Sequence, residues 1–173
     1  TAWSGDFLQY LQSNGMGSGG YTVPVGLATQ LDPLPWLNID QFTVRFSDDV
    51  VVGQSDLALL GVNVANYTFN DFVYDDTTFA ATWTLDLAPQ LGGVLGIEAD
   101  KLLVDLSETV NSTAGASLAG DSAFRFNVLP GDVVQEGGQG GVTNIVDVIR
   151  TRVLVPSSTT DGTYSAFHDI DGG

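Results

Sequence analysis

Carboxylate and amide side chains recur at the spacing of a calcium loop in a glycine-rich stretch near residue 140. A calcium loop of the EF-hand type takes side-chain oxygens at positions 1, 3, 5, 9 and 12, a glycine at position 6 and a backbone carbonyl at position 7. Counting from Glu136 places Gly141 at position 6, and positions 7, 9 and 12 fall on Val142, Asn144 and Asp147. The spacing therefore predicts a calcium-binding loop formed by these residues.

The ligand set of this loop is incomplete, and two other interpretations stay open. Positions 3 and 5 are Gly138 and Gly140, which have no side-chain oxygen. A count that starts at Asp132 supplies an aspartate at position 1, but extra residues must then loop out before Asn144. Without any metal, Asn144 could be the N-cap of a helix and Asp147 an acid in its first turn.

The end of the sequence, HDIDGG, repeats the beginning of such a loop. Asp169 and Asp171 stand at positions 1 and 3, and the sequence ends before positions 9 and 12. We therefore expect Asp132, Asp169 and Asp171 to join the calcium ligands, with calcium as the cofactor.

Side chains that commonly carry catalysis are scarce in this chain. His168 is the only histidine, and no nucleophile elbow accompanies it, so no Ser-His-Asp triad is predicted. The chain has no cysteine, and one histidine alone does not make a zinc site. We expect His168 to be an exposed tail residue.

Two adjacent acid pairs, Asp48-Asp49 and Asp75-Asp76, fall at expected turns, where aspartate is common for backbone reasons. Neighbouring residues of a strand point to opposite faces, so neither pair predicts the facing carboxylates of a glycosidase. Calcium binding at one of these turns is an open alternative. We expect that the protein is not an enzyme.

The charge balance restricts the partners. The chain has 21 acidic and five basic residues, for a formal net charge of −16. Such a surface repels phosphate backbones and anionic membranes, which argues against nucleic-acid binding. No apolar run reaches the length of a membrane span, so membrane insertion is not expected. The sequence begins with Thr1 and shows no signal peptide, and we expect a piece of a longer protein or a matured product.

The elements that would position these residues are mostly strands. Apolar and polar side chains alternate in residues 41–46 and most clearly in residues 77–87, whose Trp83 we expect in the core. Short strands separated by turn residues predict a mainly β fold, an antiparallel β-sandwich of immunoglobulin type. The expected strands are residues 21–25, 41–46, 50–52, 57–60, 62–69, 77–87, 101–106 and 124–128.

Helical patterns lie at both ends. In residues 1–11, Trp3, Phe7, Tyr10 and Leu11 fall on one face of a short helix that Ser4 or Thr1 can cap and that docks onto the main domain. A second stripe, which we expect on a terminal helix, consists of Ile145, Val148, Ile149 and Val153. The predicted domains are residues 1–20 (helix and glycine-rich linker), 21–129 (sandwich) and 130–173 (loop-helix segment).

Three stretches resemble bacterial Ig-like domains. Residues 42–50, FTVRFSDDV, are similar to an early strand of that family, and residues 101–106, KLLVDL, to a later one. Residues 110–120, VNSTAGASLAG, resemble the loop that follows. This resemblance implies a binding, spacing or adhesion module rather than an enzyme.

The last part of the chain resembles a type I dockerin. Residues 129–133, LPGDV, are similar to the start of such a module, and residues 144–148, NIVDV, to its loop exit and helix start. The two resemblances together imply a non-catalytic interaction module of a large secreted or cell-surface bacterial protein. They also imply a calcium-dependent dockerin-like segment, an incomplete EF-hand-like loop and helix, with a cohesin-like protein partner or other domains of the parent protein.

A carbohydrate-binding module, or a non-catalytic part of a polysaccharide-degrading enzyme, is the alternative. Trp36, Tyr67 and Tyr74 could form an aromatic platform on which a polysaccharide stacks. Packing of these side chains in the core or at its rim is the other interpretation.

Overall fold

A computed structural model describes residues 3–87, 96–133 and 165–169. The chain forms two compact units, which are described separately. The terminal unit comprises Thr1–Ile39, Ile97–Ala99 and Phe126–Gly173, and the strand unit comprises Asp40–Gly96 and Asp100–Arg125.

The terminal unit begins with helix α1 (Gly5–Ser13). Ser4 is its N-cap: the Ser4 Oγ accepts a hydrogen bond of 3.2 Å from the Phe7 amide, which satisfies one of the free donors of the first turn. Phe7 and Leu11 are fully buried on one face. The predicted N-terminal helix is confirmed, with bounds shifted from residues 1–11 to Gly5–Ser13. Phe7 and Leu11 of its apolar stripe are buried, and Trp3 lies before the helix.

Trp36 is the centre of the terminal unit and is fully buried. The rings of Trp3, Phe7, Tyr21 and Phe167 surround it at centroid distances between 5.0 and 5.6 Å. The other elements of this unit are η1 (Ala28–Leu31), β1 (Pro33–Leu34), the end of β9 and η4 (Ala166–His168).

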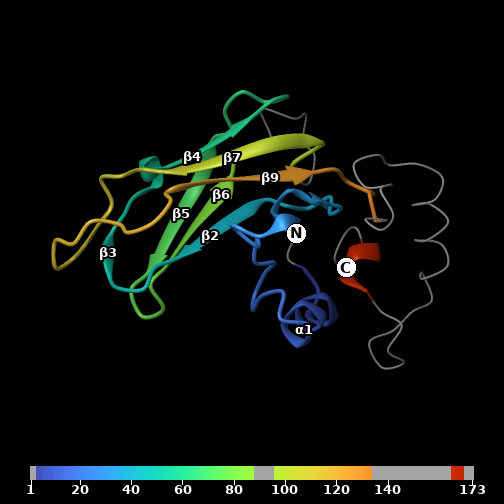
Figure 1. The fold of residues 1–173 in the computed structure, drawn as a ribbon, viewed down its shortest axis with the longest axis horizontal. Helices are drawn as coiled ribbons and strands as arrows, with labels where there is room; N and C mark the ends of the chain where they lie inside the picture. The colour runs from blue at the N-terminus through green and yellow to red at the C-terminus, as the bar shows by residue number, and fades with distance from the viewer. Residues whose placement is uncertain (1–2, 88–95, 134–164, 170–173) are drawn as a thin grey trace. The chain divides into compact units, whose positions relative to one another are not determined.

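The strand unit contains two larger sheets and a short strand pair. In one sheet β4 (Leu57–Gly61) pairs with β7 (Asp100–Leu106), and β9 (Ala123–Val128) follows β7 in the strand order. The end of β9 belongs to the terminal unit, where it pairs with β1. The other sheet has the order β2-β6-β5, and Figure 1 shows its strands running diagonally relative to β4 and β7. The bounds are β2 (Gln41–Arg45), β6 (Ala80–Leu85), β5 (Phe69–Asp75), β3 (Val50–Val51), β8 (Asn111–Ser112) and η2 (Gln54–Asp56).

Trp83 occupies the core of the strand unit. It lies between its cross-strand partners Phe42 and Phe72, and it is fully buried. Its indole Nε1 donates a 3.0 Å hydrogen bond to the Gln54 carbonyl, so burial leaves no unpaired donor on the ring. The alternation in β6 therefore reflects one buried and one polar face, as the sequence indicates.

The mainly β architecture is confirmed, and the described strands are consistent with a β-sandwich. The antiparallel prediction is wrong at one place, because β1 pairs with β9 in parallel, with Pro33 opposite Asn127 and Leu34 opposite Val128. The EF-hand-like or dockerin-like loop-helix segment falls mostly in residues 134–164, outside the described residues.

Several strand predictions are wrong in position. Residues 21–25 form no strand; Pro24 lacks a ladder donor, and Tyr21 packs on Trp36 instead. The strand expected at residues 62–69 is a loop followed by β5, which begins at Phe69. The strand expected at residue 77 begins at Ala80, because Phe79 has a φ of 53° and belongs to the turn that joins β5 to β6.

Replacing Trp83 by alanine should lower the free energy of unfolding by about 3–5 kcal/mol, because it opens a cavity in the core and removes the bond to Gln54. Urea unfolding followed by fluorescence measures this loss. Thr82→Val, on the polar face of the same strand, is the control and should cost less than about 1 kcal/mol. Equal losses for the two variants would contradict the assignment of Trp83 to the core.

Candidate functional site

The Asp100 carboxylate organises the loop that follows β4. Its Oδ1 accepts hydrogen bonds from the amides of Val62 (2.8 Å) and Asn63 (2.9 Å). Its Oδ2 accepts from the Val64 amide (3.1 Å) and from the Tyr67 hydroxyl (2.9 Å). Asp100 is 5% exposed, so this buried charge is balanced by donors from a single loop.

Gly61 allows the Asp100 carboxylate to lie close to the backbone of the loop after β4. A Cβ at Gly61 would overlap the Asp100 Oδ2 and the Val64 carbonyl, so only glycine fits there without a shift. The Lys101 amide supplies a further donor to Asp100 at 2.8 Å. Asp100 is not among the site residues that the sequence predicted. The signal that could have indicated it is an acid at the start of a strand, together with a glycine and an asparagine at the loop that it contacts.

Burial by itself would raise the pKa of Asp100, because it removes water from the charged form. The hydrogen bonds from the Asn63 and Val64 amides, and from the Tyr67 hydroxyl, favour the carboxylate and outweigh burial. The pKa of Asp100 therefore lies below its ordinary value, and the group is a carboxylate at neutral pH. A group with this pKa is suited to bracing a loop and not to donating a proton.

The acid pairs singled out in the sequence also support turns. The Tyr74 hydroxyl donates to Asp49 Oδ1 at 2.8 Å and accepts from the Val50 amide at 3.0 Å. Burial and the nearby Asp49 carboxylate raise the pKa of the Tyr74 phenol. Asp75 accepts from the Thr78 hydroxyl at 2.7 Å, which with neighbouring backbone donors lowers its pKa. The turn prediction for these acids is confirmed.

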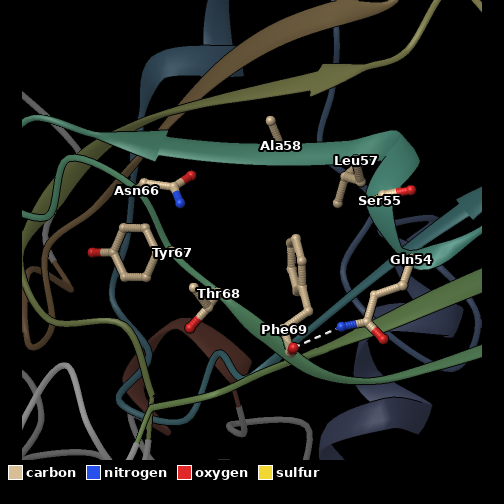
Figure 2. Close-up of a pocket in the computed structure, with 8 residues that line it drawn as sticks. All are labelled: Gln54, Ser55, Leu57, Ala58, Asn66, Tyr67, Thr68 and Phe69. Atoms are coloured by element: carbon tan, nitrogen blue, oxygen red, sulfur yellow. Dashed lines mark hydrogen bonds between the residues drawn. The ribbon is translucent and has the colours of Figure 1, made fainter.

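A hollow of about 370 Å³ lies beside β4 and η2 in the strand unit. Figure 2 shows the Phe69 ring standing within it and the Gln54 amide reaching the Phe69 carbonyl, a 2.7 Å hydrogen bond. The Tyr67 hydroxyl is bonded to Asp100. The lining consists of apolar, amide and hydroxyl side chains: Gln54, Ser55, Leu57, Ala58, Asn66, Tyr67, Thr68 and Phe69. It presents no carboxylate or imidazole, so the hollow itself supplies no general acid or base.

Of the two interpretations of the aromatic side chains, packing in the core or at its rim holds for Trp36, Tyr67 and Tyr74, and these side chains form no platform. Trp36 is fully buried among the rings of the terminal unit, and Tyr67 is 3% exposed beneath the loop after β4. Tyr74 is half-buried and held by its bonds to Asp49 and Val50. The polar group of each of these side chains is hydrogen-bonded within the protein, so each ring can be buried without leaving an unpaired donor.

Two of the predicted calcium ligands fall within the described residues. Asp132 is fully buried, and its amide donates to the Leu129 carbonyl at 3.0 Å. Asp169 follows η4 and its amide donates to the Ala166 carbonyl at 3.3 Å. The other predicted ligands lie outside the described residues: Glu136, Val142, Asn144, Asp147 and Asp171.

In the part of the chain that the structure describes, no group of three or more histidine, cysteine or acidic side chains is arranged to hold a metal. The calcium loops stay predictions. His168 belongs to η4. Within the same residues, no helix has the length and apolarity needed to cross a membrane.

Comparison with known proteins gives weak similarities. No protein-family model matches the chain, and no curated protein matches it. Among solved structures, the N-terminal part of the bacterial S-layer protein SbsC is 16% identical, with a TM-score of 0.41 over 53% of this chain. The S-layer protein rSbsC(31-844) and domains 1–6 of SbsC are each 14% identical, with TM-scores of 0.40 over 57% and 54% of this chain.

The matches extend over 21%, 13% and 12% of those three chains. This chain therefore corresponds to about a fifth or less of each of them.

Asp100→Asn should lower the free energy of unfolding at pH 7 by about 2–3 kcal/mol, because it removes the charge that five donors share. The folded pKa of Asp100 lies below the unfolded value near 3.9, so the carboxylate stabilises the protein above that value and loses its effect as pH falls through the folded pKa. The difference between the wild type and Asp100→Asn should therefore shrink as pH falls below about 4. Urea unfolding at several pH values measures it.

Asp105→Asn is the matched control, since Asp105 is an exposed acid of the same strand. Its effect should stay within about 0.5 kcal/mol at neutral pH. A wild-type advantage over Asp100→Asn that is unchanged at pH 2 would show that the charge of Asp100 does not hold the loop.

Proposed function

We propose that the chain is a non-catalytic structural and interaction module of an extracellular or cell-surface bacterial protein. Its sandwich would be of immunoglobulin type, and a calcium-stabilised, dockerin-like segment would follow it and mediate protein–protein assembly. The observation that carries the non-catalytic part is the state of Asp100, a buried carboxylate whose oxygens are occupied by the donors of one loop.

The other acids with strong contacts support the same conclusion. Asp49 is bonded to the Tyr74 hydroxyl, and Asp75 holds the turn between β5 and β6 through Thr77 and Thr78. Catalytic carboxylates keep a face directed at a substrate. These carboxylates instead direct their oxygens at backbone amides and hydroxyls of their own unit, as expected of a module that resists deformation.

The strand order supports the immunoglobulin-type proposal. In the constant-type domain, strands C, F and G form one sheet and strands B, E and D the other. The sheet β4-β7-β9 has the order C-F-G, and the sheet β2-β6-β5 has the order B-E-D. Trp83 then lies on the central strand of the second sheet, packed against Phe72 at a centroid distance of 5.0 Å.

The assembly part of the proposal depends on the two calcium-loop patterns and on the dockerin resemblance. Asp132, which starts the alternative count of the first loop, and Asp169, at position 1 of the second loop, both belong to the terminal unit. Calcium bound at these patterns would order the segment, and a cohesin-like protein would then recognise it. The parent protein would be secreted or displayed on the cell surface.

Calcium binding is tested by titrating CaCl₂ into the EDTA-treated full chain in a calorimeter. We expect heat of binding and a higher melting temperature, because a ligand that binds only the folded state stabilises it by about 2.7 kcal/mol at 100 times its Kd. Asp147→Ala should weaken this binding, whereas Asp105→Asn should leave it unchanged. Neither heat nor a shift in melting temperature would remove calcium, and with it the dockerin-like role, from the proposal.

The non-catalytic part has a separate test. Incubation of the full chain with a panel of polysaccharides should release no reducing ends, and pull-down on the same insoluble polysaccharides should recover no protein. Hydrolysis that disappears when one acid is replaced would establish an enzyme. Binding without hydrolysis would instead favour a carbohydrate-binding module, and the hollow around Phe69 would be the first place to substitute.

A further inference from the structure

Trp36 joins two parts of the terminal unit that lie far apart in sequence. Its indole Nε1 donates a buried 2.9 Å hydrogen bond to the Ala166 carbonyl, 130 residues later in the chain. The Phe167 ring stacks on Trp36 with a centroid distance of 5.6 Å and an interplanar angle of 27°. Ala166 is also fully buried, so η4 is docked by its side chains as well as by its backbone.

The N-terminal helix packs on the same tryptophan. The rings of Trp3 and Phe7 lie 5.4 Å and 5.5 Å from Trp36, and the Trp3 indole donates to Asn38 Oδ1 at 2.6 Å. Helix α1 and η4, dark blue and red in Figure 1, also contact each other. We call Trp3, Phe7, Trp36, Ala166 and Phe167 the Trp36 clasp.

Backbone bonds next to Trp36 hold the chain where it leaves β9. The Leu129 amide donates to the Leu34 carbonyl at 3.0 Å, and the Gly131 amide donates to the Pro35 carbonyl at 2.9 Å. The stretch Leu34–Trp36 is therefore bonded to two later segments, one that follows β9 and one in η4.

The position of the clasp in the sequence has a mechanical consequence. Both stretches of the strand unit, Asp40–Gly96 and Asp100–Arg125, lie between Trp36 and Ala166. Tension that enters before Trp3 and leaves after Phe167 can pass directly through the contacts of the clasp. We propose that the Trp36 clasp carries tension between the two ends of the chain and keeps the strand unit free of that tension until the clasp opens.

The contacts of the Trp36 clasp are suited to carrying tension. Several ring contacts and a buried hydrogen bond meet on the Trp36 side chain, so η4 is released from it only when both the Phe167 stacking and the Ala166 hydrogen bond are lost. The inference goes beyond the proposed function, because it concerns the order in which parts of the chain yield and holds whether or not calcium binds.

Single-molecule force spectroscopy of the full chain, with handles at Thr1 and Gly173, tests the proposal. Opening the clasp frees the stretch between Val133 and Ala166 or the stretch between Trp3 and Trp36, each at most ~110 Å long at ~3.4 Å per residue. Unfolding the strand unit from Asp40 to Arg125 frees ~290 Å on the same basis. We expect the shorter release to precede the longer one in every trace.

Three variants distinguish the clasp from the strand unit. Phe167→Ala removes the stacked ring without altering α1, and Trp36→Phe removes the hydrogen bond to Ala166 while keeping a ring. Both should lower the force of the shorter release, or abolish it, and leave the force of the longer release unchanged. Trp83→Phe, in the core of the strand unit, should lower only the force of the longer release.

The proposal is overturned by wild-type traces in which the ~290 Å release comes first, since the strand unit would then bear tension while the clasp is closed. It is equally overturned if Phe167→Ala and Trp36→Phe both leave the force of the shorter release unchanged.

Discussion

The strand unit depends on a buried negative charge that its own backbone neutralises. Asp100 stands at the first position of β7, where its side chain accepts from three consecutive amides of the loop after β4 and from Tyr67. Without these donors a carboxylate that is 5% exposed would be strongly destabilising. The same contact fixes the path of the chain from β4 to the other sheet, because Tyr67 also donates its amide to the Leu59 carbonyl at 2.9 Å.

The described part of the terminal unit is held together by aromatic contacts. Among its described residues, α1 is the one α-helix and strand residues are few, and aromatic rings gather around Trp36. Large rings bury much apolar area with little loss of side-chain freedom, which suits a unit assembled from distant parts of the chain. Polar atoms at its centre are paired: the Trp36 indole reaches Ala166, and the Trp3 indole reaches Asn38.

Local patterns in the sequence predicted the parts of the fold that local physics determines. The alternation around Trp83 fixed the faces of β6, and Ser4 before an apolar stripe indicated the start of α1. β5 escaped prediction because its exposed positions carry Asn70, Asp71 and Asp75, which reduce the apparent strand propensity of an edge strand. The turn at Phe79 escaped as well, since a positive φ is uncommon for a large side chain.

The site was less predictable than the fold, for a physical reason. Asp100 and its donors are brought together by pairing between β4 and β7, and no spacing rule links them. Residue type did not decide between an aromatic platform and core packing for Trp36 and Tyr67, because it does not reveal whether a tertiary partner exists for the polar end of the ring. The calcium pattern, unlike the Asp100 site, has a spacing that is visible in the sequence. Most of its residues lie outside the described part of the chain.

The charged Asp100 side chain holds the loop after β4 through its hydrogen bonds. The most direct measurement is the pKa of the Asp100 carboxyl group in the folded chain. NMR gives this pKa from the chemical shift of the carboxyl carbon as pH is lowered. We predict a pKa clearly below the ordinary aspartate value of about 3.9, because the donors favour the charged form. A value at or above 3.9, as a proton-donating carboxyl would show, would contradict it.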